Sequence, residues 1–393
     1  MCPPSRWPQK SSAHQRRVAL VAALAVAVST GYGQPPPRGR ASSQQIGRPS
    51  RDSSGVEIVE YPKMPTTSLL RIEARPILDL GGLRRDAKEE LDERQPFLSA
   101  VQLDDGIIVV NETSQLKFFS ASGAYLRTAG RKGSGPGEFS QTREVCRFRG
   151  DSLLVTDYSD GRLSVWTAAG NHVSTLARPG FVAEGTCRPD GTVIVRGLIG
   201  PGRTAEYWIS TPDGGKVRSL GLLPTAEYSG PILREVSIVP YGEELIVGDA
   251  RSFEARIVGR DGRVRRVLRV VRPPRLVSDD EWKSLVLSMI PLSASEEQRQ
   301  SMLTRMSAQA KPSAFPAFSH IRTDPERRIW FNEYGNSSAW TVFDRNGVLL
   351  GRVELPWVSS SLAGFTRDRI IVRHRDVDGA VHLSFHRLLE SQR

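Results

Sequence analysis

Residues 131–139 read Arg-Lys-Gly-Ser-Gly-Pro-Gly-Glu-Phe, and this glycine-rich hinge lies between two segments of the same design. The segments 100–130 and 144–177 both consist of short apolar strands separated by turns that contain Gly or Asp, in the same order. Self-similarity at a period of about 40 residues, built from such strands and turns, is typical of the blades of a β-propeller. The hinge therefore marks the boundary between two blades.

The repeat continues beyond the second segment. Three further copies lie at 185–220, 236–268 and 319–353, and an incomplete sixth copy at 362–386 lacks its outermost strand. We expect Ile72–Leu80 to supply that strand, because pairing the two chain ends in one blade closes the ring and protects its edges. The predicted fold is therefore an all-β, six-bladed β-propeller over 56–390. A β-sandwich also shows regular short strands, but the long fixed period and the Gly-Pro-Gly hinge favour blades.

The segment 278–310 breaks the period between the fourth and fifth copies. Ser278-Asp279-Asp280-Glu281 and Ser293-Ala294-Ser295-Glu296 both fit the capping box that begins a helix, and apolar residues follow each at helical spacing. We expect a helical hairpin inserted between blades 4 and 5, lying on one rim. It is open whether this hairpin is a packing ornament over one end of the channel or a lid or docking surface.

The N-terminal segment has the composition of an export signal. Lys10, Arg16 and Arg17 precede an apolar run at 18–28, and small residues follow as far as Gly33. This order predicts a secretory signal peptide over 1–33, and a run of about 11 residues is too short to span a bilayer. The Arg16-Arg17 pair leaves a twin-arginine export route open beside the ordinary one.

The mature protein is therefore expected to be secreted or periplasmic, in either case extracytoplasmic, with no membrane span after processing. Residues 34–55 are rich in Pro, Gly, Ser and Arg and carry no apolar period, which predicts a disordered linker. The formal net charge is +11, and four basic residues and no acidic ones lie in 1–33, so 11 − 4 leaves +7 after cleavage. Because the arginines are scattered and the protein is exported, we expect no nucleic-acid partner.

Two cysteines, Cys146 and Cys187, remain after cleavage, and they fall at the end of the first strand in consecutive repeats. An oxidising compartment permits a bridge between them. We expect neighbouring first strands to be too far apart for a disulfide, which favours two separate buried thiols over a bridge. The sequence has neither a Cys-x-x-Cys pair nor a Cys/His ligand spacing, so it predicts no zinc motif and no metal site of that kind.

Polar residues follow the second strand of several repeats and form the candidate ligand-binding site. They are Asn111, Glu112, Asp157, Asp249, Arg251, Asn332 and Glu333. If the repeats superimpose, these side chains lie on one face, where oxygen ligands could hold Ca²⁺ or Arg251 could bind an anion. The competing interpretation is that Asp and Asn cap strand ends by accepting hydrogen bonds from nearby backbone N–H groups. His382 and His386 have strand spacing and are interpreted as packed or solvated residues, and the expected cofactor is none.

The hinge Gly130–Phe139 resembles the inter-blade hinge of the NHL-repeat-like bacterial six-bladed β-propellers, as do Asp151–Asp157, Gly161–Trp166 and Val377–Val381. The resemblance covers Val56 to Leu389 and implies a secreted propeller. Related propellers include lyases and lactonases with a metal in the channel, and modules that bind proteins or RNA. Those enzymes use several His, Asp or Glu ligands. This chain instead places Ala100, Val145 and Thr186 near the comparable strands, with His320 as the lone imidazole.

Two functions remain open from the sequence. The first is a secreted, non-catalytic binding propeller that presents loops to a protein, a peptide or a glycan and acts as a monomer, because the sequence shows no catalytic motif such as Gly-x-Ser-x-Gly or a Walker loop. The second is a metal-dependent hydrolase or lyase at the mouth of the channel, suggested by Asp157, Asp249, Asn332 and Glu333. The departure from the enzyme pattern favours the first, so an enzyme is the less expected of the two.

Overall fold

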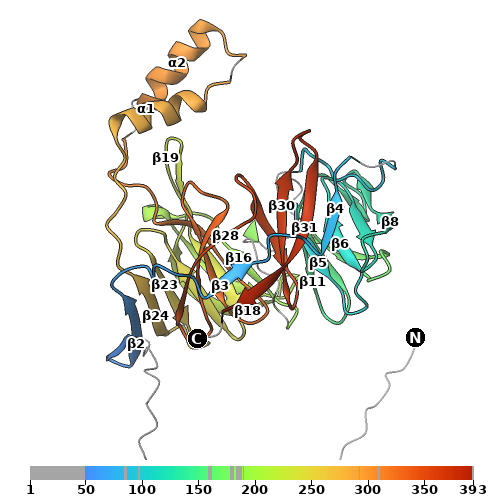
Figure 1. Ribbon diagram of the computed structural model, residues 1–393, viewed down its shortest axis with the longest axis horizontal. Coiled ribbons are helices and arrows are strands. Elements are labelled where there is room, and N and C mark those ends of the chain that lie inside the picture. The colour runs from blue at the N-terminus through green and yellow to red at the C-terminus, as the bar shows by residue number, and fades with distance from the viewer. Residues whose placement is uncertain are drawn as a thin grey trace, which may run out of the picture. The chain divides into compact units, whose positions relative to one another are not determined.

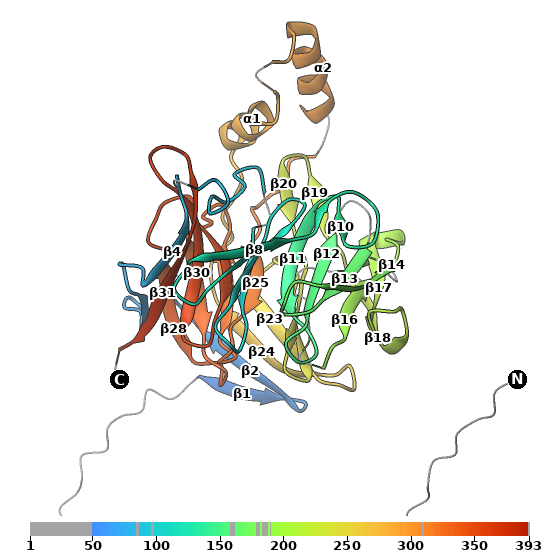
Figure 2. The same ribbon diagram turned by 90° about the vertical axis from the view of Figure 1, so that its right-hand side faces the viewer.

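The computed structural model describes residues 49–391, apart from 84–85, 96–97, 158–161, 178–180, 183–187, 189, 292 and 308–309. Within these residues the repeats form the six blades of a β-propeller, as the sequence predicted (Figures 1 and 2). The predicted signal peptide and most of the predicted linker lie outside the described residues.

Blades 1 to 3 each consist of four antiparallel strands, taken in order from the propeller axis outwards. Blade 1 contains β5 (Ala100–Gln102), β6 (Ile108–Asn111), β7 (Leu116–Phe119) and β8 (Tyr125–Ala129). Blade 2 contains β11 (Thr142–Arg147), β12 (Leu153–Asp157), β13 (Arg162–Trp166) and β14 (His172–Ala177). Blade 3 contains β15 (Phe181–Val182), β16 (Val193–Arg196), β17 (Thr204–Ser210) and β18 (Lys216–Pro224), with a short 3₁₀ turn at Pro201–Arg203.

Blades 4 to 6 follow the same plan. Blade 4 contains β21 (Ser237–Tyr241), β22 (Glu244–Gly248), β23 (Glu254–Val258) and β24 (Val264–Val270). Blade 5 contains β25 (Phe318–Thr323), β26 (Ile329–Glu333), β27 (Ala339–Phe343) and β28 (Leu349–Glu354). Blade 6 contains β29 (Ser361–Phe365), β30 (Arg369–Arg375) and β31 (Val381–Glu390). The first strand of blade 3 begins at Phe181, so the predicted start of that repeat at 185 is too late.

The core lies between the blades, which explains the apolar runs in the second strands. Ile108, Val109 and Val110 of β6 are all fully buried. Val109 packs with residues of blade 2, whereas Ile108 and Val110 pack with residues of blade 6. Because both faces of a blade are covered, the strand does not need the alternation of apolar and polar residues that a half-exposed sheet shows.

The hinge connects blades 1 and 2 through a close approach that requires glycine. Two short parallel strands, β9 (Arg131–Lys132) and β10 (Glu138–Phe139), pair inside it. Gly130 has φ +77°, and a Cβ atom there would lie 2.5 Å from the Phe139 ring. Phe139 is fully buried and stacks on Trp166 of blade 2 at 5.3 Å between ring centroids. The hinge therefore fixes how the two blades pack.

The ring closes as predicted, by pairing the N-terminal segment with the last blade, but two short strands replace the single strand expected over Ile72–Leu80. β3 (Leu70–Ile72) and β4 (Leu78–Gly81) both pair antiparallel with β31, and they cover the edge that blade 6 would otherwise expose. The chain also touches blade 5 on its way, because the Leu69 backbone N–H donates to the Leu350 carbonyl oxygen at 2.7 Å.

A second N-terminal contact corrects the prediction of a linker that extends to residue 55. β1 (Ser50–Ser53) pairs antiparallel with β2 (Val56–Tyr61), and β2 pairs parallel with β24, so blade 4 carries two extra outer strands. The charges match across this pairing: Glu57 forms an ion pair with Arg266 at 2.6 Å, and Glu60 with Arg269 at 2.8 Å. Residues 50–81 thus form an N-terminal belt along blades 4, 5 and 6.

The cysteine prediction also needs a correction. Cys146 is disulfide-bonded, so it is not the separate buried thiol that the sequence favoured. The other cysteines of the chain, Cys2 and Cys187, lie outside the described residues. First strands of neighbouring blades converge near the axis: the Val145 backbone N–H of blade 2 donates to Ser99 Oγ, beside the first strand of blade 1, at 3.3 Å. Such convergence removes the objection that the inner strands are too far apart.

The predicted helical hairpin is present between blades 4 and 5, as α1 (Asp279–Ser288) and α2 (Glu296–Ser307). Ser278 caps α1 in the predicted capping box with Glu281. The cap of α2 is Ser295 with Gln298, two residues later than predicted. Figures 1 and 2 show that the helices stand above the blades, on the same side as the hairpin of β19 (Glu227–Ser229) and β20 (Ile232–Arg234). The predicted position on one rim is confirmed for α1, because Trp282 and Leu285 pack against the buried cluster of Ile232, Val277 and Phe315. α2 has no buried residue among its described side chains.

Candidate functional site

The propeller axis contains a cavity of about 810 Å³. Its walls come from the first strands β5, β11, β21, β25 and β29, which belong to blades 1, 2, 4, 5 and 6. Clefts of this size are the usual place for a ligand that is held by several parts of one protein. Ionisable side chains line it: Glu144, Arg147, Glu235, His320, Arg322, Asp324 and Arg327.

Arg322 differs from the other cations of the cavity. It is half-buried on β25, and its Nε atom is shielded from solvent. Within the described part of the chain its side chain forms neither a hydrogen bond nor an ion pair. By contrast, Arg147 pairs with Asp104 at 2.6 Å, and Arg327 lies 3.5 Å from Glu244. An arginine that has lost part of its hydration without gaining a carboxylate is a ready anion site.

The predicted site residues of blade 1 form hydrogen bonds and an ion pair with other residues of the protein. Asn111 is fully buried, and its Oδ1 accepts hydrogen bonds from the Ser99 N–H at 2.6 Å and from Ser99 Oγ at 2.9 Å. Glu112 is 2% exposed and pairs with Lys117 at 3.1 Å. Its carboxylate also accepts from the Asp92 N–H at 2.9 Å. These groups hold the strand end and the preceding loop together.

The predicted site residues of blades 2 and 4 form hydrogen bonds and ion pairs with residues close to them in sequence. Asp157 is 1% exposed, accepts from the Ser140 N–H at 2.7 Å and lies 3.4 Å from the guanidinium of Arg162. Asp249 accepts from the Arg251 N–H at 3.1 Å, and the two side chains approach to 3.7 Å. The Arg251 side chain is 67% exposed, so this pair is a solvated turn.

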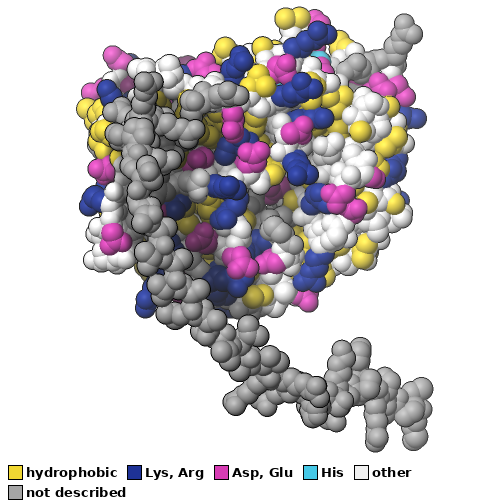
Figure 3. Space-filling view, turned by 60° about the horizontal axis from the view of Figure 1, so that its bottom comes forward, with side chains coloured by type: hydrophobic (Ala, Val, Ile, Leu, Met, Phe, Trp, Pro, Cys, Tyr) yellow, Lys and Arg dark blue, Asp and Glu magenta, His cyan; other side chains and the backbone are white. Residues whose placement is uncertain are grey.

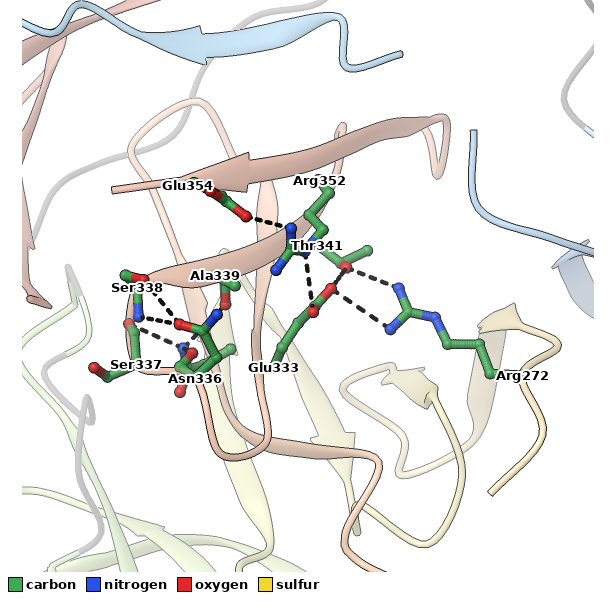
Figure 4. Close-up of polar contacts among 10 residues, drawn as sticks. Arg272, Glu333, Asn336, Ser337, Ser338, Ala339, Thr341, Arg352 and Glu354 are labelled. Atoms are coloured by element: carbon green, nitrogen blue, oxygen red, sulfur yellow. Dashed lines mark hydrogen bonds and ion pairs between the residues drawn. The ribbon is translucent and has the colours of Figure 1, made fainter. Parts of the chain in front are cut away.

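In blade 5, Glu333 belongs to the polar cluster in Figure 4. Glu333 lies between two guanidinium groups, 3.6 Å from Arg272 and 3.1 Å from Arg352, and accepts from Thr341 Oγ1 at 3.0 Å. Burial lowers the pKa of Arg272, while Glu333 opposes that shift. Asn332 donates from Nδ2 to three carbonyl oxygens, including that of Ala339 at 3.1 Å.

Asn111 also reaches the neighbouring blade, because its Nδ2 donates to Thr142 Oγ1 of blade 2 at 3.2 Å. Asn111, Asp157 and Asp249 accept hydrogen bonds from backbone N–H groups, as the capping interpretation expects, whereas Asn332 donates to carbonyl oxygens and Glu333 pairs with arginines. Their role as ligands for Ca²⁺ or an anion stays a prediction.

The sequence missed a cluster of imidazoles in blade 6. His374, His382 and His386 share one face of its sheet with Ser384, and Asp79 of β4 pairs opposite Ser384. Ligand atoms of Asp79, His374 and His382 all lie within 4.8 Å of one another. Burial lowers the pKa of His374 and that of His386. The sequence feature that could have revealed the cluster is the predicted pairing of Ile72–Leu80 with this blade. That pairing places the Asp79 carboxylate beside histidines about 300 positions away in sequence.

Comparisons with known proteins place the fold but give no family. No family model matches the chain, and no curated protein matches it. Among solved structures, it is similar to a "Putative exported protein" from Bacteroides fragilis, with TM-score 0.53 and 11% identity over 85% of this chain and 100% of that chain. It is also similar to a member of the DUF4221 family from Bacteroides vulgatus, with TM-score 0.52 and 11% identity over 82% of this chain and 99% of that chain.

At this identity the two structures support the fold alone, and membership of the NHL-repeat family stays a prediction. Among the described residues, no helix has the length and apolar character needed to cross a membrane.

Proposed function

We propose that this protein is an exported, non-catalytic binding propeller that receives an acidic group of a peptide or glycan in its central channel. The observation that carries the proposal is Arg322, a half-buried guanidinium on the cavity wall with no partner among the described residues. A carboxylate can accept two parallel hydrogen bonds from such a group. The ligand would then restore the interactions that Arg322 lost when β25 took its place at the axis.

The size and polarity of the cavity suit this class of ligand. A volume of about 810 Å³ accommodates a few residues of a peptide or two to three sugar units. Carboxylates line the cavity beside the arginines, at Glu144 and Glu235, so it is not uniformly basic. A ligand that combines one acidic group with hydroxyl or amide groups fits this mixed lining better than a polyanion does.

The charge distribution on the outer surface also favours a ligand other than nucleic acid. On the face shown in Figure 3, Lys and Arg side chains are interspersed with Asp and Glu. Binding to nucleic acid depends on a continuous basic surface that neutralises several phosphates at once. This face does not provide one.

A metal-dependent hydrolase or lyase at the channel mouth is the weaker candidate. The oxygen ligands that suggested it, including Asp157 and Glu333, already accept hydrogen bonds or pair with arginine. A cation at either position would have to displace these bonds. Export is supported by the signal-like residues 1–33, by the disulfide of Cys146 and by the name of the Bacteroides fragilis protein.

The test is a binding screen with purified mature protein against acidic and neutral peptides and oligosaccharides, followed by titration of the best ligand. We expect Arg322→Gln to weaken binding by about tenfold to a hundredfold, as loss of a charge-assisted hydrogen bond requires. Arg265→Gln, which changes an exposed arginine outside the cavity, is the control and should bind as the wild type does. Equal affinity of wild type and Arg322→Gln, or a ligand recovered chemically altered, would refute the proposal.

A further inference from the structure

We propose that Asp79, His374 and His382 form a binding site for one transition-metal ion, with Zn²⁺ as the best-suited cation. The site lies on the outer three strands of blade 6, on the face toward blade 5. It combines β30, β31 and the N-terminal strand β4. It lies away from the first strands that line the channel, so this inference does not rest on the proposed function.

The three ligand groups converge. His382 Nδ1 lies 2.8 Å from Asp79 Oδ2, and His374 Nε2 lies 2.8 Å from Ser384 Oγ, which in turn donates to Asp79 Oδ1 at 2.6 Å. The two imidazole rings stack at 4.9 Å between centroids, only 13° from parallel. Four ligands placed about 2.05 Å from a tetrahedral zinc are about 3.4 Å apart. The observed separations, all within 4.8 Å, differ from that value by at most about 1.4 Å.

Groups around the three ligands hold them in place. His382 Nε2 lies 3.1 Å from Asp376 Oδ2, so one ring nitrogen faces a carboxylate while the other faces the site. Asp376 is itself fixed, because it accepts hydrogen bonds from the Asp378 N–H at 3.0 Å and from the Ala380 N–H at 2.9 Å. Metal-binding histidines commonly donate their second N–H to a carboxylate in this way, which fixes the tautomer and ring orientation.

Packing contacts fix the rings further. Trp357, in the connection from blade 5, stacks on His374 with ring centroids 3.5 Å apart and planes 15° from parallel. Gly82 has φ +72°, and a Cβ atom there would lie 2.5 Å from Cε1 of His382. The backbone of Gly82 therefore rests against the His382 ring, which explains why a glycine follows Gly81 at this point. A site whose ligands are pre-positioned loses little entropy when the ion binds.

Ligand chemistry selects the cation. Two imidazole nitrogens and one carboxylate suit Zn²⁺ and its neighbours in the first transition row, whereas Ca²⁺ and Mg²⁺ prefer sites made of oxygen alone. Solvent reaches the cluster, because the side chains of Asp79 and His382 are 34% and 14% exposed. Three protein ligands with access for a water molecule correspond to an open zinc site.

The experiment is a calorimetric titration of the metal-depleted protein, without a polyhistidine tag, with Zn²⁺ alone. We expect about one Zn²⁺ per chain. Asp79→Asn and His382→Gln should each lower the affinity by at least about 100-fold, and Asp376→Asn by about 10–100-fold. His172→Gln removes a histidine of blade 2 and is the matched control, with unchanged affinity. The Arg322→Gln variant should also bind Zn²⁺ normally, which separates this test from that of the channel ligand.

Asp79→Asn keeps the acceptor for Ser384 Oγ and has nearly the same shape, so it reports on metal binding even where a histidine variant fails to fold. Co²⁺ provides a second readout on the unaltered protein, since its visible spectrum reports coordination by histidine nitrogen in a four-coordinate site. The proposal is overturned if wild type binds no Zn²⁺, if Asp79→Asn binds as tightly as wild type, or if His172→Gln loses affinity to the same extent. In each of those cases the cluster is a hydrogen-bonded packing feature of blade 6.

Discussion

The buried ion pair between Glu112 and Lys117 allows a quantitative test of whether a predicted ligand residue is structural. The two side chains are 3% and 8% exposed, and their charged atoms are 3.1 Å apart. Lys117 also donates to the Glu90 carbonyl oxygen, so the pair connects blade 1 to the loop before it. We predict that Lys117→Met destabilises the protein by about 3–5 kcal/mol, because the Glu112 carboxylate is left buried without its counter-charge.

The size of the thermal shift follows from the size of the folded unit. Residues 48–393 form one compact unit. At about 2.1 cal/mol/K per residue, its unfolding entropy is about 0.7 kcal/mol/K, so the predicted loss lowers Tm by about 4–7 °C. Glu112→Gln combined with Lys117→Met removes both charges, and this double variant should recover at least about 2 kcal/mol of the loss.

The assay is urea and thermal unfolding of the four proteins of this double-mutant cycle, followed by circular dichroism at neutral pH. Arg265→Met serves as the control, because its ion pair with Asp261 is 54% and 43% exposed and should contribute at most about 1 kcal/mol. A Lys117→Met protein as stable as wild type would refute the reasoning. So would a double variant no more stable than Lys117→Met, because the charges would then not be coupled.

Three further predictions concern the hinge and the disulfide. Gly130→Ala should lower the free energy of chemical unfolding by about 2–4 kcal/mol, because it adds a clash with the buried Phe139 ring to backbone strain. Gly150 has φ +60° and nothing within 4 Å, so Gly150→Ala should lower it by about 1 kcal/mol. Equal losses in the two variants would exclude the clash. Hydrogen bonds from the Gly135 N–H and from Arg131 hold the pKa of Glu138 below its usual 4.5. The stability difference between wild type and Glu138→Gln should therefore be complete above pH 4.5 and disappear as the pH falls through the folded-state pKa. A difference that does not vary with pH would contradict this. Peptide mass mapping without reductant should find Cys146 linked to Cys187, the one other cysteine left after cleavage of the signal peptide. Reduction of this disulfide should lower the free energy of unfolding by about 2–5 kcal/mol. An unlinked Cys187 would contradict the prediction.

The blades could be predicted because each repeats a local pattern. Apolar strands such as Ile108–Val110 and the intervening Gly and Asp turns carry their own signal, and the capping box at Ser278 does the same for α1. The N-terminal hairpin could not be predicted in this way. β2 is stabilised by β24, more than 200 positions away, through ion pairs such as Glu57 with Arg266. Such complementarity becomes visible only when the pairing partner is known.

The candidate site residues also divide into those that a local pattern reveals and those that only long-range pairing reveals. The polar residues after the second strands were found because they recur in several blades, yet recurrence also fits the capping role in which Asn111 and Asp157 accept from backbone N–H groups. The histidine cluster escaped detection because its carboxylate comes from the far end of the chain. His382 and His386 have the spacing of ordinary strand residues, and only the register that sets Asp79 opposite Ser384 reveals a shared face.

The N-terminal belt has a consequence for how the protein acquires its structure. The ribosome makes residues 50–81 early, but the surfaces they dock on, β24, Leu350 and β31, are made late, and β31 ends at Glu390. β2 can pair only after β24 has been made, and β3 and β4 only after β31, so the edges of these early strands stay unpaired until then, and such edges invite pairing with other chains. Ring closure thus requires the last blade, and a chain exported in extended form would complete it only after β31 has crossed the membrane.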